Sequence, residues 1–267
     1  AYLDGVLARL LDHPRARSGI VAVTADHGEV LGRLEHEAAA VAVTGILAVW
    51  NDCRQGREAD YESWYVGQHL PERVAIAGFR LGRRYISIAA RQPAYFTYYE
   101  TDTPTVMRSS AYLARVNEPT PETRAIMLDG FCNMSRTVCR RAEVEGTGRG
   151  SFAVAARIEA GANADLARHW PLQTSVAGRL RTELWISDEI EDAEASAEER
   201  LRGKDRKIAA CLFAEFCFEQ DAARALAALE GSLGPRADID AYRLLCSFDA
   251  ADLRGRALRG PLVKGLP

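Results

Sequence analysis

The chain has 267 residues, nearly half of them hydrophobic and about a quarter charged, with a formal net charge of −3. This is the composition of a globular protein, and the length allows one large domain or two of ordinary size. The 34 basic residues are outnumbered by 37 acidic ones and form no basic stripe, which argues against a nucleic-acid partner. No apolar run reaches the roughly 20 residues of a membrane span and the first residues lack a signal peptide pattern, so we expect a cytoplasmic protein.

The first 44 residues predict a helix and then a buried strand, and we interpret them as an N-terminal appendage. Residues 21–29, VAVTADHGE, resemble the metal-binding turn of the alkaline phosphatase and sulfatase superfamily. That resemblance would make Asp26 and His27 ligands of a divalent ion. Such a site needs further ligands and a nucleophile on separate strands, for which 44 residues have no room, so we favour a chance match or a remnant.

From residue 45 onward the predicted elements come twice in the same order, strand-helix-strand-strand-helix-strand. The first copy has strands at 45–52, 79–89, 93–101 and 134–141 and helices at 59–70 and 109–116. The second copy has strands at 151–159, 179–187, 207–218 and 240–249 and helices at 162–170 and 220–231. We expect Ser109 or Ser110 and Asp221 to cap helices, and Gly231 to end one.

This order predicts an α+β fold of two tandem ferredoxin-like modules, each an antiparallel sheet covered by helices. The predicted domains, in chain order, are the appendage (1–44), the first module (45–142), the linker (143–150), the second module (151–250) and the C-terminal tail (251–267). The linker EVEGTGRG is rich in glycine, which predicts a flexible connection. The highly charged stretch at 187–205 predicts a solvated loop or an exposed helix.

Two segments at the same offset support the duplication. HLPERVAIAGF (69–79) and HWPLQTSVAGR (169–179) match at the histidine, the proline and the Ala-Gly pair. Because proline disrupts a helix interior, we expect the first helix to stop at about His69–Leu70. His69 would then lie at the helix C-terminus, where the dipole and partial burial together leave its pKa near neutrality, suitable for acid–base catalysis.

His69 shares one helix face with Tyr61, Trp64 and Tyr65, and this face should cover the sheet. A structural alternative is a hydrogen-bonded capping histidine that the duplication copied. Only the first copy gathers many tyrosines around its histidine, so any activity is expected there.

Arg83 and Arg84 alternate faces on a predicted strand, so one of them should point to the pocket or covered side, where it could bind a carboxylate or enolate; the alternative for each is a solvated arginine. The predicted catalytic residues are therefore His69, Tyr65 and Arg84. The predicted substrate-binding residues are Trp64, Tyr85, Tyr98 and His169. In this hypothesis His69 moves a proton, tyrosines orient the substrate and Arg84 stabilises a developing negative charge.

The segment YESWYVGQHLPERVAIAGFRLGRRY (61–85), with the sequences at 95–101, 109–124 and 131–140, resembles an uncharacterised bacterial family in the dimeric α+β barrel superfamily, near the EthD-like group. His69, Pro71 and Gly78 carry the helix-end pattern of that group. The resemblance covers about 45–150 strongly, with 151–250 as a degenerate second half.

The resemblance implies an enzyme that needs no cofactor and acts on a small apolar or aromatic molecule, as an isomerase, cyclase, lyase or monooxygenase. It implies either a homodimer or an intramolecular pseudo-dimer in which the two copies pair their sheets. The alternatives are a non-catalytic module that binds a small molecule or assists an oxygenase, and a haem-binding barrel with His69 or His169 as axial ligand. The six cysteines show no Cys-x-x-Cys spacing and predict reduced, mostly buried thiols.

Overall fold

The computed structural model describes residues 44–159, 178–188 and 195–253. All of them belong to residues 43–267, the second of the two units into which the chain divides. The predictions for the N-terminal appendage, including Asp26 and His27, and for the helix at 162–170, including His169, lie outside these residues. Across the described ranges, the helices are all too short or too polar to span a bilayer.

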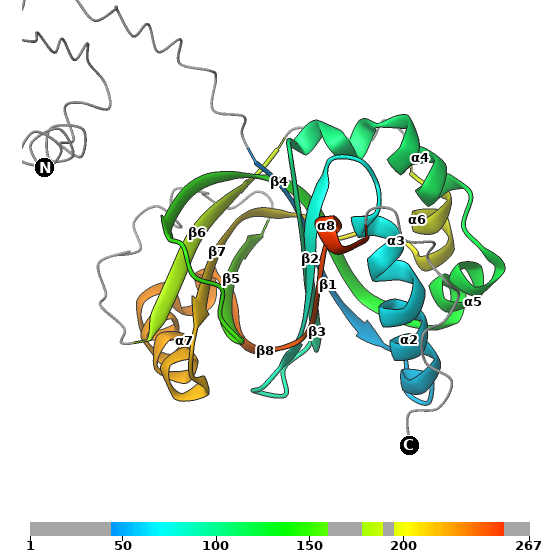
Figure 1. The fold of residues 1–267 in the computed structure, drawn as a ribbon. Helices are drawn as coiled ribbons and strands as arrows, with labels where there is room; N and C mark the ends of the chain where they lie inside the picture. The colour runs from blue at the N-terminus through cyan, green and yellow to red at the C-terminus, as the bar shows by residue number, and fades with distance from the viewer. Residues whose placement is uncertain (1–43, 160–177, 189–194, 254–267) are drawn as a thin grey trace, which may run out of the picture. The chain divides into compact units, whose positions relative to one another are not determined.

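Eight antiparallel strands close into a barrel in the order β1-β3-β2-β8-β5-β7-β6-β4 (Figure 1). The strands are β1 (Gly45–Cys53), β2 (Phe79–Ser87), β3 (Tyr95–Thr101), β4 (Phe131–Gly146), β5 (Phe152–Glu159), β6 (Arg179–Ser187), β7 (Ile208–Phe216) and β8 (Asp238–Asp249). Each predicted strand from residue 45 onward is confirmed, and the fold class is α+β.

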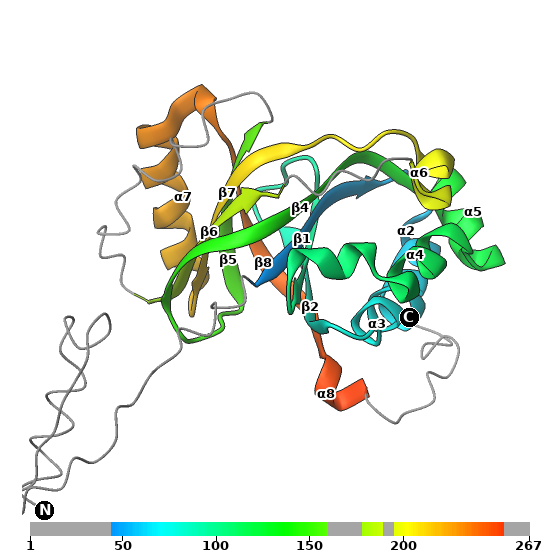
Figure 2. The same ribbon diagram turned by 90° about the horizontal axis from the view of Figure 1, so that it is seen from above.

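Helices cover the outside of the barrel on two sides (Figures 1 and 2). One side carries α2 (Glu58–Trp64), the π-helical η2 (Tyr65–His69), α3 (Leu70–Val74), α4 (Ser110–Asn117), α5 (Pro121–Asp129) and α6 (Ala197–Arg202). The other side carries α7 (Glu219–Leu233). The short elements η3 (Pro104–Arg108), η5 (Gly234–Arg236) and α8 (Ala250–Leu253) complete the described chain.

Two long strands join the halves of the barrel. β4 pairs with β1 through residues 131–140 and with β6 through 139–146, while β8 pairs with β5 through 238–243 and with β2 through 242–249. The first half is thus β4-β1-β3-β2 and the second half β8-β5-β7-β6, and the two have the same strand order.

Two glycines hold matching positions in the halves. Gly78 and Gly178 directly precede β2 and β6, with φ of 91° and 76°, a left-handed conformation that side chains with a Cβ rarely adopt. The Gly78 carbonyl accepts a hydrogen bond from the Asp102 amide (2.8 Å), and the Gly178 carbonyl accepts one from the Cys217 amide (3.1 Å). In both halves the glycine turns the chain into the strand that follows it.

The first helix does not stop before Pro71, as the sequence suggested, but continues to Val74. The chain widens into a π turn at Tyr65–His69, where the Leu70 amide bonds to the Tyr65 carbonyl five residues back. This wider turn accommodates the proline, which has no amide hydrogen to donate. His69 therefore lies inside a continuous helical run and not at its C-terminal end.

Of the predicted helix caps and ends, one is confirmed and two are wrong. The Ser109 side chain caps α4 by accepting from the Tyr112 amide at 3.2 Å, as predicted. Asp221 caps no helix: it lies in the first turn of α7, whose N-cap is Phe218. Gly231 does not end α7, which runs to Leu233 because an exposed glycine weakens a packed helix without breaking it.

The first half of the predicted linker, residues 143–146, is strand, because β4 runs to Gly146. Beyond it, Arg149 donates to the Tyr98 hydroxyl and to Glu100, each at 2.6 Å, and the Gly150 carbonyl accepts from Arg83 at 2.6 Å. The segment is therefore fixed at the end of the barrel and is not a flexible connection.

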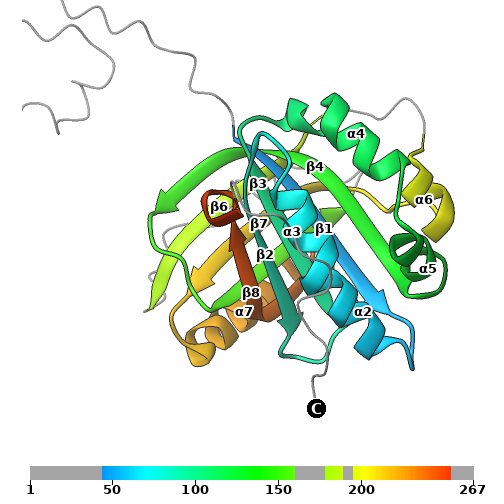
Figure 3. The same cartoon turned by 45° about the vertical axis from the view of Figure 1, so that its right-hand side comes forward.

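The charged stretch at 187–205 contains α6, which packs on α4 and α5 of the first half (Figure 3). Glu198 and Asp205 are buried, and Arg202 bonds to Asp205 through two nitrogens. The prediction of a solvated loop or exposed helix is wrong here, because partners on the first half and within α6 neutralise these charges.

Aromatic side chains fill the inside of the barrel. Trp50, Phe96, Tyr98, Trp185 and Phe213 are fully buried there. Their rings stack closely, with centroids 4.7 Å apart for Trp50 and Phe96 and 4.8 Å for Trp185 and Phe213. The described part of the interior is therefore a packed core, and we look for a ligand site outside it.

We predict that Gly82→Ala lowers the free energy of unfolding by about 1–3 kcal/mol. A Cβ at Gly82 would lie 2.8 Å from side-chain atoms of Leu70 and Val74, so these side chains or α3 itself would have to shift. Urea unfolding measures the change. Gly231→Ala is the control: a Cβ there meets nothing within 4 Å, and we expect a gain of about 0.5–1 kcal/mol. Equal stability of the two variants would contradict the close helix–strand contact.

Candidate functional site

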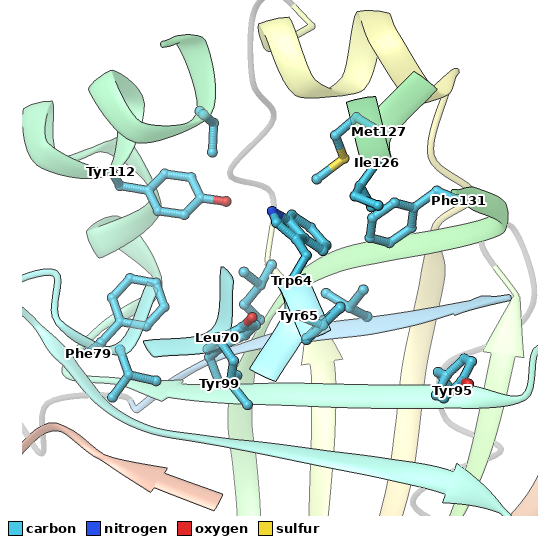
Figure 4. Packing of buried hydrophobic residues seen from close by; sticks show 14 of the residues in the cluster. Trp64, Tyr65, Leu70, Phe79, Tyr95, Tyr99, Tyr112, Ile126, Met127 and Phe131 are labelled. Carbon is cyan, nitrogen blue, oxygen red and sulfur yellow. The ribbon is translucent and has the colours of Figure 1, made fainter. Parts of the chain in front are cut away.

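A cavity of about 70 Å³ lies between the outer face of the first half and its helices. Its sheet wall includes Leu47, Tyr99 and Arg136, from β1, β3 and β4. The π turn, α4, α5 and α6 close it from the other side, and Figure 4 shows side chains of α4 and α5 directed toward Trp64 and Tyr65. Most of the wall is apolar, with a few polar groups, which is the usual make-up of a small-molecule site.

The π turn places His69 in the wall of this cavity. Its ring packs on Trp64 and Tyr65, with centroids 4.5 and 5.0 Å apart. Trp64 is itself anchored, because its indole nitrogen donates to Thr123 Oγ1 on α5 at 3.1 Å. Within the described ranges neither imidazole nitrogen is hydrogen-bonded, so the ring is held by packing while its nitrogens stay available to a ligand.

Burial lowers the pKa of His69 well below its usual 6.5, and the positive charges of Arg73, Arg202, Arg84 and Arg115 lower it further. The expectation of a pKa near neutrality is therefore wrong. It relied on a helix C-terminus beside the ring, whereas the helix continues and brings Arg73 one turn away. At neutral pH His69 is uncharged and able to accept a proton.

Charged groups surround the same cavity. Arg73 of α3 forms a buried ion pair with Glu198 of α6. Arg136 of β4 donates to the Tyr112 hydroxyl at 2.7 Å. Two buried polar atoms of the lining make no regular hydrogen bond, the Tyr99 hydroxyl and Nη1 of Arg73.

The structure brings three of the predicted residues together: Trp64 and Tyr65 contact His69. Tyr65 also lines the cavity and donates from its hydroxyl to Thr97 Oγ1 at 3.1 Å. Arg84 lies on the same side of the sheet but outside the lining. Its guanidinium carbon lies 3.7 Å from the centre of the Tyr65 ring, and Nη2 pairs with Glu62 at 2.8 Å.

Tyr85 and Tyr98 lie on the opposite side of the sheet, in the barrel interior. The Tyr85 hydroxyl donates to Glu215 at 3.0 Å, and the Tyr98 hydroxyl accepts from Arg149. Since side chains alternate along a strand, these two tyrosines cannot face the cavity that Tyr99 lines. Their predicted part in substrate binding therefore has no geometric link to His69.

The polar end of the barrel interior is an ion network. Although burial disfavours its charged form, hydrogen bonds and charges from Arg141 and Arg149 lower the pKa of Glu100 to about 2. Burial outweighs Arg83 and Arg149 at Glu215 and raises its pKa. With its charges paired at close range, this network serves to join the halves.

Sequence reasoning missed several cavity residues: Arg73, Tyr99, Tyr112, Arg136, Glu198 and Arg202. Arg73 could have been found, because it follows His69 by four residues on the same helix face once the helix is known to continue. Glu198 and Arg202 could not, since nothing in a charged insertion of the second half indicates that it crosses to the first.

The described residues do not supply a metal site, because no three His, Cys, Asp or Glu side chains gather among them. They also do not fit a haem beside His69. The cavity of about 70 Å³ is half of the roughly 150 Å³ that holds benzene, so a porphyrin ring does not fit, and the Arg73–Glu198 pair lines it.

We predict that acid destabilises the wild-type protein more than a His69→Gln variant. Below pH 6.5 the unfolded chain gains a proton at His69 that the folded chain does not, because burial keeps the folded pKa low. The stability difference between the two proteins should therefore shift toward the variant by up to about 1.4 kcal/mol per pH unit below 6.5. Urea titrations from pH 8 to 5 measure it. The difference should be constant above pH 7.5, and parallel curves below pH 6.5 would refute the lowered pKa.

Comparison with known proteins shows the fold and no closer relation. No family model and no curated protein matches the chain. Among solved structures, an anthrone oxidase-like protein has a TM-score of 0.50 at 7% identity, covering 81% of this chain and 97% of its own. A protein named "putative monooxygenase" from Fusobacterium nucleatum has a TM-score of 0.48 at 10% identity, covering 84% and 99%. A chlorite dismutase variant from Candidatus Nitrospira defluvii has 0.41 at 12%, covering 80% and 94%. The first likeness, at such low identity, shows a shared α+β barrel fold alone.

Proposed function

We propose that the protein is an α+β barrel enzyme that moves a proton on a small molecule, with His69 as the base and no cofactor. The observation that carries the proposal is the His69 ring itself. It is uncharged at neutral pH, its nitrogens are not hydrogen-bonded within the described ranges, and it faces a cavity lined mostly by apolar side chains. A histidine so placed is suited to accept a proton from a bound ligand.

In the proposed step, an imidazole nitrogen of His69 accepts a proton from a C–H or O–H group of the substrate. The electron pair of that bond stays on the substrate as an enolate. Return of the proton to a different atom completes an isomerisation without any further reactant. The same first step begins the cyclase, lyase and cofactor-free monooxygenase reactions that the sequence resemblance implies. Tyr65 is proposed to orient the substrate, and Arg84 to fix the Tyr65 ring.

The size of the cavity limits the substrate. About 70 Å³ is half of the roughly 150 Å³ that holds benzene in a protein interior. We therefore propose a substrate of a few heavy atoms, and the three-ring substrate suggested by the name of the anthrone oxidase-like structure does not carry over. Met127 and Met134 in the wall are unbranched and able to adjust to the ligand's shape.

We also propose that the halves are tandem ferredoxin-like copies related to the EthD-like group. The equal strand order, the glycines 100 residues apart and their matching hydrogen bonds support a duplication. The bulges between Phe79 and Leu81 and between Arg179 and Arg181 support it further, because both lie at the start of the strand that follows the glycine. Closure within one chain then makes the barrel an intramolecular pseudo-dimer.

We predict that the wild-type protein catalyses deuterium exchange into a small carbonyl compound and that His69→Gln slows it by about 100-fold or more. The probes are acetone, butanone and pyruvate in D₂O, followed by NMR. Glutamine preserves much of the packing on Trp64 but cannot take the proton.

The Gly231→Ala protein, altered on α7, is the control and should exchange at the wild-type rate. Equal rates for wild type and His69→Gln would reject the base. Binding of the probes without exchange by either protein would favour the alternative of a non-catalytic small-molecule-binding module.

A further inference from the structure

The cavity presents two buried polar atoms without a regular hydrogen bond; one is Nη1 of Arg73, and the other is the Tyr99 hydroxyl, which has only an irregular interaction with Tyr65. Tyr99 is 1% exposed and Arg73 is 3% exposed, and both line the cavity. Because a buried polar group without a partner costs about 1–3 kcal/mol, two of them at one cavity indicate a ligand that supplies an acceptor.

Both unsatisfied atoms are hydrogen-bond donors, and one of them carries positive charge. Arg73 already uses Nη2 for Glu198, so Nη1 is the part of its guanidinium left for a ligand. A second guanidinium, that of Arg202, lies 4.0 Å from the other oxygen of Glu198. The one carboxylate in the lining therefore lies between two arginines, so an acceptor oxygen that carries negative charge is the best complement to this wall.

We propose that the cavity binds a small organic acid anion, a carboxylate or an enolate, whose oxygen accepts hydrogen bonds from Arg73 Nη1 and Tyr99. The apolar part of the ligand then packs on Leu47, Val49 and Phe131. This inference rests on the proposed function and names its substrate class. It also gives the anion a second effect: its negative charge offsets the guanidiniums near His69 and raises the pKa of the imidazole toward neutrality, which makes it a better base.

Propanoate and its neutral isostere propanamide test the proposal on the full chain. The reporter is the NMR resonance of the His69 ring, which is identified by its loss in His69→Gln. Propanoate should shift this resonance to saturation and raise the pKa of His69, and propanamide should bind at least about tenfold more weakly. Equal binding of the two, or no binding of propanoate, would overturn the proposal.

Variants of the Arg73–Glu198 pair show whether propanoate binding depends on the hydrogen-bond donor of Arg73 or only on the net charge of the pair. Glu198→Gln removes the competing carboxylate and should tighten propanoate binding. The double variant R73Q/E198Q keeps the wild-type charge but lacks the donor and should weaken binding about tenfold or more. Tyr99→Phe should weaken it by a smaller factor. Weaker binding in Glu198→Gln, or unchanged binding in the double variant, would contradict the assignment.

A second Arg–Glu pair provides a matched control. Arg115 of α4 and Glu72 of α3 lie 3.6 Å apart, outside the cavity lining. The double variant R115Q/E72Q should bind propanoate like the wild type, so a loss of affinity there would attribute the effect to general loosening of the helices.

The proton-transfer function and the anion site can be rejected independently of each other. His69→Gln should still bind propanoate, as measured by calorimetry, while losing deuterium exchange. Binding that follows the pattern above without exchange in the wild type would reject the proton-transfer function and keep the anion site. Exchange on acetone together with equal binding of propanoate and propanamide would reject the anion site and keep the proton-transfer function.

Discussion

Closure of the barrel is the constraint on which the rest of the structure depends. Each half has four strands and therefore two edges with unpaired backbone groups, which would otherwise be open to further pairing. The ladders of β2 with β8 and of β4 with β6 use all four edges at once. The space they enclose is narrow and filled by Trp50, Phe96, Trp185 and Phe213. Among the described residues, the candidate cavity accordingly lies on the outer face of the first half, beneath helices.

The alternation of side chains along each strand sorts the many tyrosines of the first half into two groups. Tyr95 and Tyr99 face the helices and belong to the core beneath them, whereas Tyr85 and Tyr98 belong to the barrel interior. A cluster of tyrosines in the sequence is thus two clusters in space. Only the outer group contributes to the cavity, and the inner group serves the contact between the halves through Glu215 and Arg149.

Much of the fold could be predicted from the sequence because strand alternation and the repeated Ala-Gly pairs are local signals. The positions of β1 to β8 followed from residue type, and Gly78 and Gly178 adopt the conformation that only glycine tolerates easily. The site was less accessible to prediction. The path of the helix past Pro71 depends on a change of helix type, and the burial of Glu198 depends on a tertiary contact between the halves. The lowered pKa of His69 could not be predicted either, because it depends on the path of the helix and on the arginines that the tertiary contact brings near.

The π turn at Tyr65–His69 also fixes the length of the chain at this point. A π turn contains one residue more than a regular turn, so removing that residue would rotate everything beyond it by about 100° around the helix axis. Leu70 and Val74 would then no longer pack against Gly82, and Arg73 would lose its ion pair with Glu198. Relatives that share this cavity should therefore vary in residue type along the helix far more readily than in the number of residues between Tyr61 and Arg73.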